Sequence, residues 1–399
     1  MSLQWLIVGG GIHGVHLAAR LMAEGGVEAE QLRIVDPAER LMARWRTCTQ
    51  ITGMTHLRSP SVHHLDMHPW SLQRFAGSRK NRKPGLFAPP YDRPALDLFN
   101  AHCDHVVETY GLDALHIQDR VASCVVECDG VTLGGADGQT YSAQNVVLAM
   151  GSGDRPRWPQ WAPVDDSQVQ HVFQPDFDGW PEQSSPQSVA VIGGGISAGQ
   201  VALRLMKEGH DVHLICRHTL REHQFDSDPG WLGPKFMGMF SHERDMDRRR
   251  AMISQARHKG SVPPDVRVGL RRAISQDQLS WYEADVEGCL GSSQEGFELT
   301  LSDGRQVCVQ RILLATGFES SRPGGAMLDA LVEAASLPCA KCGYPVVDKA
   351  LRWHPRIYVS GPLAELELGP TSRNIAGARR AGDRLIEGLR SGRPLRQAV

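Results

Sequence analysis

The strongest constraint on the fold of this 399-residue chain is a local design that occurs twice. Each copy is an apolar strand, a glycine-rich turn and a helical pattern, followed by a second strand. The first turn lies in residues 6–14 (LIVGGGIHG) and the second in residues 191–199 (VIGGGISAG). A single turn of this kind is weak evidence, because glycines at this spacing also arise by chance. Two complete copies predict an α/β fold built on two parallel sheets.

The spacing of the glycines in the first copy indicates what the turn holds. Gly9 permits a tight strand-to-helix turn, Gly11 lets the backbone approach a pyrophosphate, and Gly14 lets the helix pack closely on the strand. The helix that follows offers free backbone amides at its N-terminus. The second strand, residues 32–36, ends on Asp36, where a carboxylate can accept hydrogen bonds from a ribose diol. We therefore expect a dinucleotide at this turn.

The second copy differs from the first at two positions that matter for its ligand. Ala198 replaces the third glycine, which the motif tolerates, and Arg217 with His218 follows the second strand where the first copy has an acid. A basic side chain there can pair with a 2′-phosphate, which favours NADP over NAD. The arginine run 248–250 offers another phosphate partner, but we interpret it as an exposed helix surface and leave it out of the site.

The order of the remaining segments predicts how the two units are connected. Each copy has its own returning strand that ends on glycine, residues 146–151 and residues 312–317. A strand at 357–362 and an amphipathic helix from Ile375 to about Leu389 follow, so the chain is expected to re-enter the first unit. The fold class is thus predicted as two Rossmann-like dinucleotide-binding domains with central parallel sheets, the second inserted in the first. The expected limits are residues 1–183, 184–320 and 321–399, with the first crossing at residues 180–186.

Composition excludes several classes of partner. Lys plus Arg number 43 and Asp plus Glu 45, so the chain has no overall attraction to nucleic acid or to an anionic membrane. The apolar opening at residues 3–8 lacks a basic leader and runs into glycines, which favours a buried strand over a signal peptide. No stretch approaches the roughly 20 apolar residues of a membrane span. Nine scattered cysteines favour a reduced, cytoplasmic setting with small-molecule partners, and leave the oligomeric state open.

Two dinucleotide motifs, the second inserted between the halves of the first unit, resemble the two-dinucleotide-binding-domain flavoproteins. The resemblance covers nearly the whole chain. It implies FAD at the first turn and a nicotinamide dinucleotide, here NADPH, at the second, with hydride passing to the flavin between the domains. Disulfide reductases and flavin monooxygenases share this layout.

A further stretch resembles the N-hydroxylating branch of the class B flavin monooxygenases, known from siderophore biosynthesis. It comprises residues 45–60 (WRTCTQITGMTHLRSP) and continues to residues 87–94 (FAPPYDRP). In that family the corresponding stretch, with a Met-containing strand, lies along the flavin. Residues 171–173, 225–229 and 314–318 are looser similarities. The resemblance implies an FAD- and NADPH-dependent monooxygenase that uses O2, through a flavin hydroperoxide, to hydroxylate an amine or another soft nucleophile. The amino-acid pocket of the family does not align, so the substrate stays open.

The motifs and the resemblance together give three sets of candidate residues, and no metal site is expected. The helix that starts after Asn374 is implied to point at the flavin's pyrimidine edge, although a structural helix cap explains its sequence as well. The expected FAD contacts are Gly9, Gly11, Ile12, His13, Gly14, Asp36, Trp45, Gly151, Gly361, Gly369 and Asn374. The expected NADPH contacts are Gly193, Gly195, Ile196, Ser197, Ala198, Arg217, His218, Thr316 and Gly317. The polar residues expected near the reacting flavin are Arg58, Ser59, His63 and His64.

One CxxC motif, Cys339 to Cys342, supports a different function. Its spacing permits a redox pair, a metal-binding element or a surface turn, and no second pair completes a zinc site. As a redox pair it would favour an NAD(P)H-dependent flavin reductase that passes electrons to a disulfide, a quinone or a protein. A non-enzymatic flavin-binding redox sensor is the remaining alternative.

Overall fold

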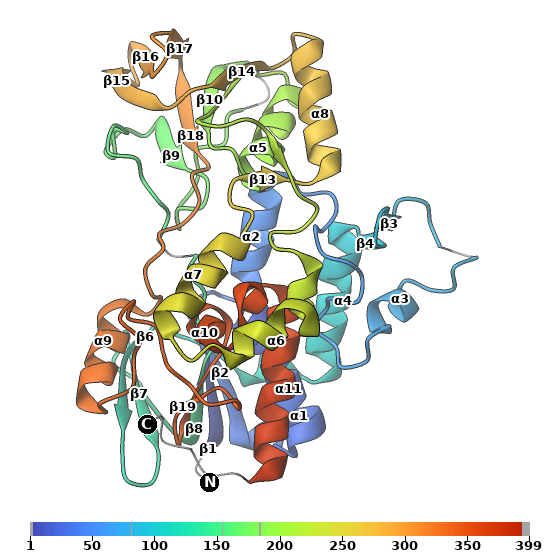
Figure 1. The fold of residues 1–399 in the computed structure, drawn as a ribbon, viewed down its shortest axis with the longest axis vertical. Coiled ribbons are helices and arrows are strands. Elements are labelled where there is room, and N and C mark those ends of the chain that lie inside the picture. The colour runs from blue at the N-terminus through green and yellow to red at the C-terminus, as the bar shows by residue number, and fades with distance from the viewer. Residues whose placement is uncertain (1–2, 81, 154, 183–184, 393–399) are drawn as a thin grey trace.

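N-terminal and C-terminal segments of the chain share the first of two sheets, at the bottom of Figure 1, which has parallel central strands and antiparallel strands added to them. The computed structural model describes residues 3–80, 82–153, 155–182 and 185–392. In the first sheet β1 (Leu3–Val8) is central, with β2 (Leu32–Asp36) and β8 (Thr140–Leu148) parallel to it on either side. β20 (Ile357–Val359) lies parallel to β8 on the side away from β1. The sheet is completed by β5 (His116–Gln118), β6 (Val121–Val126), β7 (Val131–Gly135) and β19 (Arg352–His354).

Two helices from opposite ends of the sequence pack together beside this sheet. α1 (Ile12–Gly25) follows the first glycine turn, and α11 (Ile375–Ser391) starts where the sequence predicted. Residues 45–52 of the stretch that resembles the N-hydroxylating family belong to helix α2 (Ala43–Thr52), and Met54 follows this helix. None of the helices in the described ranges has the length and apolar character that a membrane span needs. The first unit also contains α3 (Ser71–Phe75), β3 (Phe87–Ala88), β4 (Arg93–Pro94), α4 (Leu96–Thr109), α9 (Gly325–Ala334) and α10 (Glu365–Leu368).

The second sheet, at the top of Figure 1, has the strand order β14-β11-β10-β18-β9 and is entirely parallel. Because side chains alternate along a strand, Val189 and Val191 of β10 pack on one face with helices α5 and α8, whereas Ala190 and Ile192 pack on the other with a three-stranded sheet. A strand covered on both faces needs the continuous apolar run seen here. The elements are β9 (Val169–His171), β10 (Ser188–Ile192), α5 (Ile196–Lys207), β11 (Asp211–Cys216), α8 (Pro264–Ser275), β14 (Ser280–Glu283), β15 (Val286–Ser292), β16 (Gly296–Leu301), β17 (Gln306–Val309) and β18 (Arg311–Leu314).

A segment of the second unit crosses over to the first; we call residues 226–258 the strap. It contains α6 (Pro234–His242) and α7 (Met246–Ala256), which lie over α10 in Figure 1. Arg249 in α7 pairs with Glu367 of the first unit at 3.0 Å, and an apolar cluster that includes Phe240 and Leu366 fills the contact. The strap is flanked by the short strands β12 (Arg221–Glu222) and β13 (Ser261–Val262).

The predicted α/β class is confirmed. Along the chain, the strands of the second sheet lie between the strands that form the two parts of the first sheet. The predicted limit between residues 183 and 184 falls outside the described residues. β9, which was expected in the first unit, hydrogen-bonds to β18 in the second sheet. With only three residues, this strand lacks a periodic pattern that would have indicated its partner. The exact domain limits remain a prediction.

Candidate functional site

The first glycine turn has the close approaches that the motif requires. Gly9 has φ +111°, and a Cβ there would lie 2.7 Å from the Ala149 carbonyl oxygen. A Cβ on Gly14 would lie 1.7 Å from the Gly9 carbonyl oxygen, so helix and strand are as close as glycine allows. A Cβ on Gly11, in contrast, would meet no atom within 4 Å. Gly9 and Gly14 are thus packed tightly against neighbouring backbone, whereas the turn is open at Gly11, the residue expected to face a pyrophosphate.

Asp36 is fixed beside this turn. Its Oδ2 accepts a hydrogen bond from the Gly10 amide at 2.6 Å, and its Oδ1 accepts one from the Ala38 amide at 2.9 Å. A carboxylate has about four lone-pair positions, so further acceptor capacity remains for a ribose diol. The position and fixation of Asp36 fit the role expected from the sequence.

His13 links the first turn to the start of α11. His13 is 9 % exposed, and its Nδ1 lies 2.8 Å from the Ser360 hydroxyl. A Cβ on Gly361 would lie 3.8 Å from the ring, and the backbone of Arg373 and Asn374 also contacts it. Burial lowers the pKa of His13 to about 4, against the opposing effect of the Arg373 and Asn374 backbone.

Nε2 of His13 is buried without a hydrogen-bond partner among the described residues. The neutral imidazole thus belongs to the packing between the first turn and the start of α11, beside the backbone left open at Gly11. The residues around the first turn are therefore suited to hold the ADP end of FAD.

The other expected FAD contacts are distributed over the first unit. Gly151 follows β8 and Ala149, which contacts Gly9. Trp45 donates from Nε1 to the Asn100 side chain at 3.0 Å, and Asn374 donates to Asp226 of the strap at 3.0 Å. Gly369 packs against Met237 and Trp231 of the strap. The structure thus groups Gly9–Gly14, Asp36, Gly151 and Gly361, whereas Gly369 contacts the strap.

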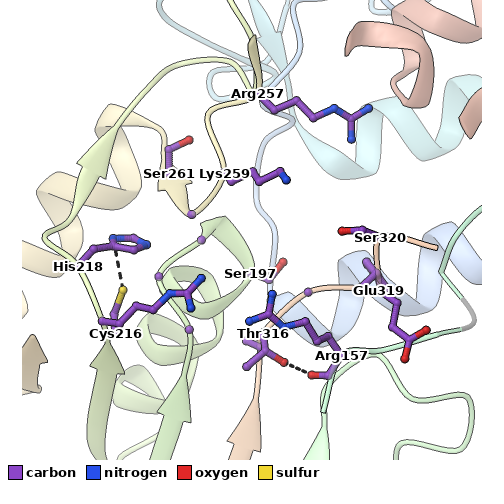
Figure 2. Close-up of a pocket in the computed structure, with 18 of the residues that line it drawn as sticks. Arg157, Ser197, Cys216, His218, Arg257, Lys259, Ser261, Thr316, Glu319 and Ser320 are labelled. Carbon is purple, nitrogen blue, oxygen red and sulfur yellow. Dashed lines mark hydrogen bonds between the residues drawn. The ribbon is translucent and has the colours of Figure 1, made fainter. Parts of the chain in front are cut away.

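The second glycine turn opens into a cavity of about 1060 Å³. Gly193 has φ +145°, and a Cβ there would lie 2.5 Å from the Ala315 carbonyl oxygen. Ala198 is fully buried and does not line the cavity. Figure 2 shows Arg257 and Lys259 across the space from Thr316 and Arg157. The other expected NADPH contacts all line the cavity, namely Gly193, Gly195, Ile196, Ser197, Arg217, His218, Thr316 and Gly317.

The cavity is strongly basic. Among its described lining residues, eight are Arg or Lys and three are Asp or Glu. Arg217, Arg221 and Lys259 lie on the second unit, as does the glycine turn. Such an excess of positive charge together with the amides of a helix N-terminus fits the phosphates of a dinucleotide. The second turn is therefore suited to hold NADPH.

The far wall of the cavity was not predicted. Arg250, Ile253, Ser254 and Arg257 line it along one side of α7. The run 248–250, interpreted as exposed, divides three ways: the Arg248 side chain is 74 % exposed, Arg249 is buried on the first unit, and Arg250 faces the cavity. The spacing i, i+3, i+4 and i+7 was the signal that one helix face is shared by these residues.

Of the four residues expected near the reacting flavin, Arg58 is the one that lines this cavity. Its guanidinium donates to the Gln224 carbonyl at 2.7 Å and to the Ser261 hydroxyl at 3.0 Å, and so ties the first unit to the second. Ser59 and His63 lie in the same segment outside the lining. His64 donates from Nε2 to the Pro69 carbonyl at 3.1 Å and accepts at Nδ1 from the Asp66 amide at 3.2 Å.

Burial lowers the pKa of His63 to about 4 and that of His64 to about 3. Both rings are therefore neutral near pH 7. Because both nitrogens of His64 bind its own loop, this residue organises the loop.

The CxxC motif lies in a turn at the edge of the same cavity. The Ala340 amide donates to the Tyr344 carbonyl at 2.9 Å, and the Gly343 amide donates to the Ala340 carbonyl at 2.8 Å. Cys339 and Cys342 are exposed free thiols, and Cys342 lines the cavity. The described residues contain no group of three or more His, Cys, Asp or Glu placed to hold a metal ion.

Comparisons with known proteins agree with this architecture. The model of a family described as pyridine nucleotide-disulphide oxidoreductase matches residues 6–245. No curated protein matches the sequence. An ornithine N-hydroxylase from Kutzneria sp. 744 is similar in structure, with a TM-score of 0.77, 17 % identity, and coverage of 98 % of this chain and 100 % of the other.

Two further solved structures share the fold. An ornithine hydroxylase from Pseudomonas aeruginosa has a TM-score of 0.73 and 18 % identity, and the match covers 98 % of this chain and 99 % of the other. A bacillithiol disulfide reductase from Staphylococcus aureus has a TM-score of 0.63 and 14 % identity, with 99 % and 100 % covered. At these identities the likeness concerns the fold, which is found with more than one chemistry.

Proposed function

The chain belongs to the pyridine nucleotide-disulphide oxidoreductase family, and from this premise we propose that it is an FAD- and NADPH-dependent monooxygenase that hydroxylates an amine or another soft nucleophile. The observation that carries the proposal is the basic cavity at the second turn. It extends from Arg217 in the second unit to Arg373, which lies two residues before α11 in the first. NADPH and the reacting end of FAD would therefore meet within one cavity.

The first unit would hold FAD. The open backbone at Gly11 and the amides at the start of α1 would bind the pyrophosphate, and Asp36 would accept from the ribose hydroxyls. When bound, FAD would accept a hydride from NADPH and supply electrons to O2, of which one atom enters the substrate and the other leaves as water. The start of α11, beside His13, would stabilise negative charge through its free amides.

The second unit would hold NADPH. The amides at the start of α5 would bind the pyrophosphate, and Arg217 would pair with the 2′-phosphate. Arg58 reaches from the first unit to the loop at His223 and Gln224 and would hold the two units in register. These roles are binding and orientation.

A rapid-mixing experiment tests the proposal. The FAD-loaded enzyme is reduced with NADPH without oxygen, then mixed with O2 in the presence of amines, amino acids or thiols. We expect at least one compound to accelerate NADPH oxidation and to gain one oxygen atom by mass spectrometry. Release of one H2O2 for each NADPH with every compound would contradict a monooxygenase.

A second candidate function is favoured by Cys342, which lines the cavity close to Arg250. An NADPH-dependent reductase could pass electrons through Cys339 and Cys342 to a disulfide substrate. The test is the double variant Cys339→Ser/Cys342→Ser, with the exposed thiols Cys128→Ser/Cys308→Ser as the matched control. Loss of disulfide reduction in the first variant alone would favour the reductase; equal rates in both would exclude it.

A further inference from the structure

The basic residues of this chain are unevenly distributed. We call residues 67–91 the arm. The whole chain has slightly more acidic than basic residues, 45 against 43, whereas the arm contains no Asp or Glu. Its five basic residues are Arg74, Arg79, Lys80, Arg82 and Lys83. The arm is therefore positively charged, while the rest of the molecule carries a net negative charge.

The arm projects from the first unit. It contains α3 and β3, and Figure 1 shows this part of the chain extending beyond α4, away from both sheets. Its base is anchored, because Leu72 is fully buried in the core of the first unit. The Met67 carbonyl also accepts a hydrogen bond from Arg379 of α11 at 3.0 Å. The arm is thus a projection with a fixed origin in the fold.

One of the five cations holds the arm together, and the other four face solvent. Arg82 donates to the Gly77 carbonyl at 3.0 Å and to the Gln73 carbonyl at 2.8 Å, and its guanidinium lies 4.9 Å from the centre of the Phe87 ring. The other four basic side chains are exposed. None of them takes part in the ion pairs that the described residues form. Their charge is thus available to an anionic partner.

Two large aromatic side chains accompany these cations. Trp70 precedes α3 and is 53 % exposed, and Phe75 ends α3 and is 42 % exposed. Phe75 stacks on His105 of α4, with 5.2 Å between the ring centroids, so its orientation is fixed. Tryptophan is on average a well-buried residue in proteins surrounded by water. Exposed Trp and Phe next to Lys and Arg are typical of surfaces that enter the headgroup layer of a bilayer.

We propose that the arm binds the surface of a membrane that contains anionic lipids, with its cations at the headgroups and with Trp70 and Phe75 in the interfacial layer. The inference does not depend on the proposed function. A projecting segment can meet a flat surface without a matching shape, whereas single-stranded nucleic acid is held in a basic groove. The same lipids would repel the negatively charged remainder of the molecule, so that the arm would face the membrane.

Flotation of the FAD-loaded enzyme with lipid vesicles tests the proposal. Vesicles of phosphatidylglycerol and phosphatidylcholine in equal parts are compared with vesicles of phosphatidylcholine alone. A basic residue near an anionic surface strengthens binding by roughly fivefold, so the mixed vesicles should be bound at least about tenfold more tightly. This preference should disappear between about 0.1 M and about 1 M salt, because the screening length falls from about 10 Å to about 3 Å.

Variants of exposed residues locate the contact. Lys80→Gln/Lys83→Gln should weaken binding to the mixed vesicles at least about tenfold. The matched control Lys207→Gln/Lys349→Gln removes the same charge from exposed positions elsewhere and should bind as the unchanged enzyme does. Trp70→Ala should weaken binding severalfold at every salt concentration, and Trp70→Phe should restore most of it. Flavin content and NADPH oxidation in solution should be the same in all of these variants.

Three outcomes would overturn the proposal. The first is equal binding to the two kinds of vesicle, and the second is an equal loss in the two double-lysine variants. The third is tighter binding of a single-stranded oligonucleotide or of polyglutamate than of the mixed vesicles, with the same dependence on Lys80 and Lys83. That result would assign the arm to a nucleic acid or to an acidic protein. Arg79→Gln serves as a second variant if Lys80→Gln/Lys83→Gln loses its flavin.

Discussion

The two glycine turns share a backbone design, but their surroundings differ. At the first turn Asp36 binds the Gly10 amide at 2.6 Å, and buried His13 connects the turn to the start of α11. At the second turn the corresponding basic residue, Arg217, faces a cavity of about 1060 Å³. The first turn is packed closely against its own unit, whereas the second opens into a basic cavity lined from both units. The motif alone predicts a dinucleotide, and the residues around it distinguish the two sites.

The third position of the motif should give the largest difference between the turns. A Cβ on Gly14 would lie 1.7 Å from the Gly9 carbonyl oxygen, whereas the second turn already carries Ala198 there. We expect Gly14→Ala to lower the free energy of unfolding by about 3 kcal/mol or more and to abolish FAD binding. Ala198→Gly should cost about 1 kcal/mol at most. Denaturant unfolding and flavin content measure both, and a well-folded, yellow Gly14→Ala variant would contradict the comparison.

The residue at the end of the second strand should decide cofactor choice. Removing the charged partner of a 2′-phosphate costs about 1.5–3 kcal/mol, so Arg217→Ala should weaken NADPH about 10- to 100-fold and leave NADH nearly unchanged. Reduction rates of the bound flavin with each dinucleotide provide the measurement. Arg248→Ala, exposed on α7, is the control. If the ratio of the reduction rates with NADPH and NADH were unchanged in Arg217→Ala, Arg217 would not pair with the 2′-phosphate.

The middle glycines should separate binding from folding. A Cβ on Gly11 would meet no atom within 4 Å, and one on Gly195 would have its nearest contact at 3.8 Å, with Gly260. Gly11→Ala and Gly195→Ala should therefore fold normally. We expect the first to lose FAD and the second to raise the KM for NADPH about tenfold with FAD retained, because each methyl group intrudes on a pyrophosphate. The opposite pattern would reverse the assignment of the two turns.

Lowering the pH should reduce the stability of the first unit through the histidines of α1, which the second unit lacks in α5. Burial lowers the pKa of His13 to about 4 and that of His16 to about 3, from an ordinary 6.5, while α5 contains no histidine. The unfolded chain thus takes up protons below pH 6.5 that the folded chain refuses. Stability should be constant above pH 6.5 and should fall as the pH drops through 4, by about 3 kcal/mol at pH 4 for His13 alone.

The measurement is the free energy of unfolding between pH 7 and 4. His16→Gln should flatten the decline, whereas replacement of exposed His68 by Gln should not. An equal slope in both variants would mean that other groups control the acid response.

The sequence was sufficient for features that depend on neighbours along the chain. The glycine turns, the strands beside them and Asp36 follow from local spacing and side-chain periodicity. The positions of Arg250 and Cys342 at the cavity could not be predicted in this way, because the strap and the turn at 339–345 reach the cavity through contacts with distant segments. An arginine run is usually solvated, and only tertiary packing divides it into exposed, buried and cavity-lining members.

The predicted flavin-side residues illustrate the same limit. Arg58 reaches the cavity through bonds to residues more than 160 positions away, which no local pattern encodes. His64 was expected near the reacting flavin, and in the folded chain both of its ring nitrogens bind its own loop. A functional histidine and a structural one have the same letter in a sequence, and hydrogen-bond partners distinguish them.

The strap has a consequence for how this molecule moves. Rotation of one unit away from the other would pull Arg249 from Glu367 and from the Leu366 carbonyl, with which it bonds at 3.0 and 2.7 Å. It would also expose the apolar contact around Phe240 and Leu366 to water. We expect the two units to stay docked throughout a catalytic cycle. The nicotinamide would then enter and leave past side chains at the mouth of the cavity. The rate of turnover would be limited by passage through this opening and not by a hinge motion of the two units.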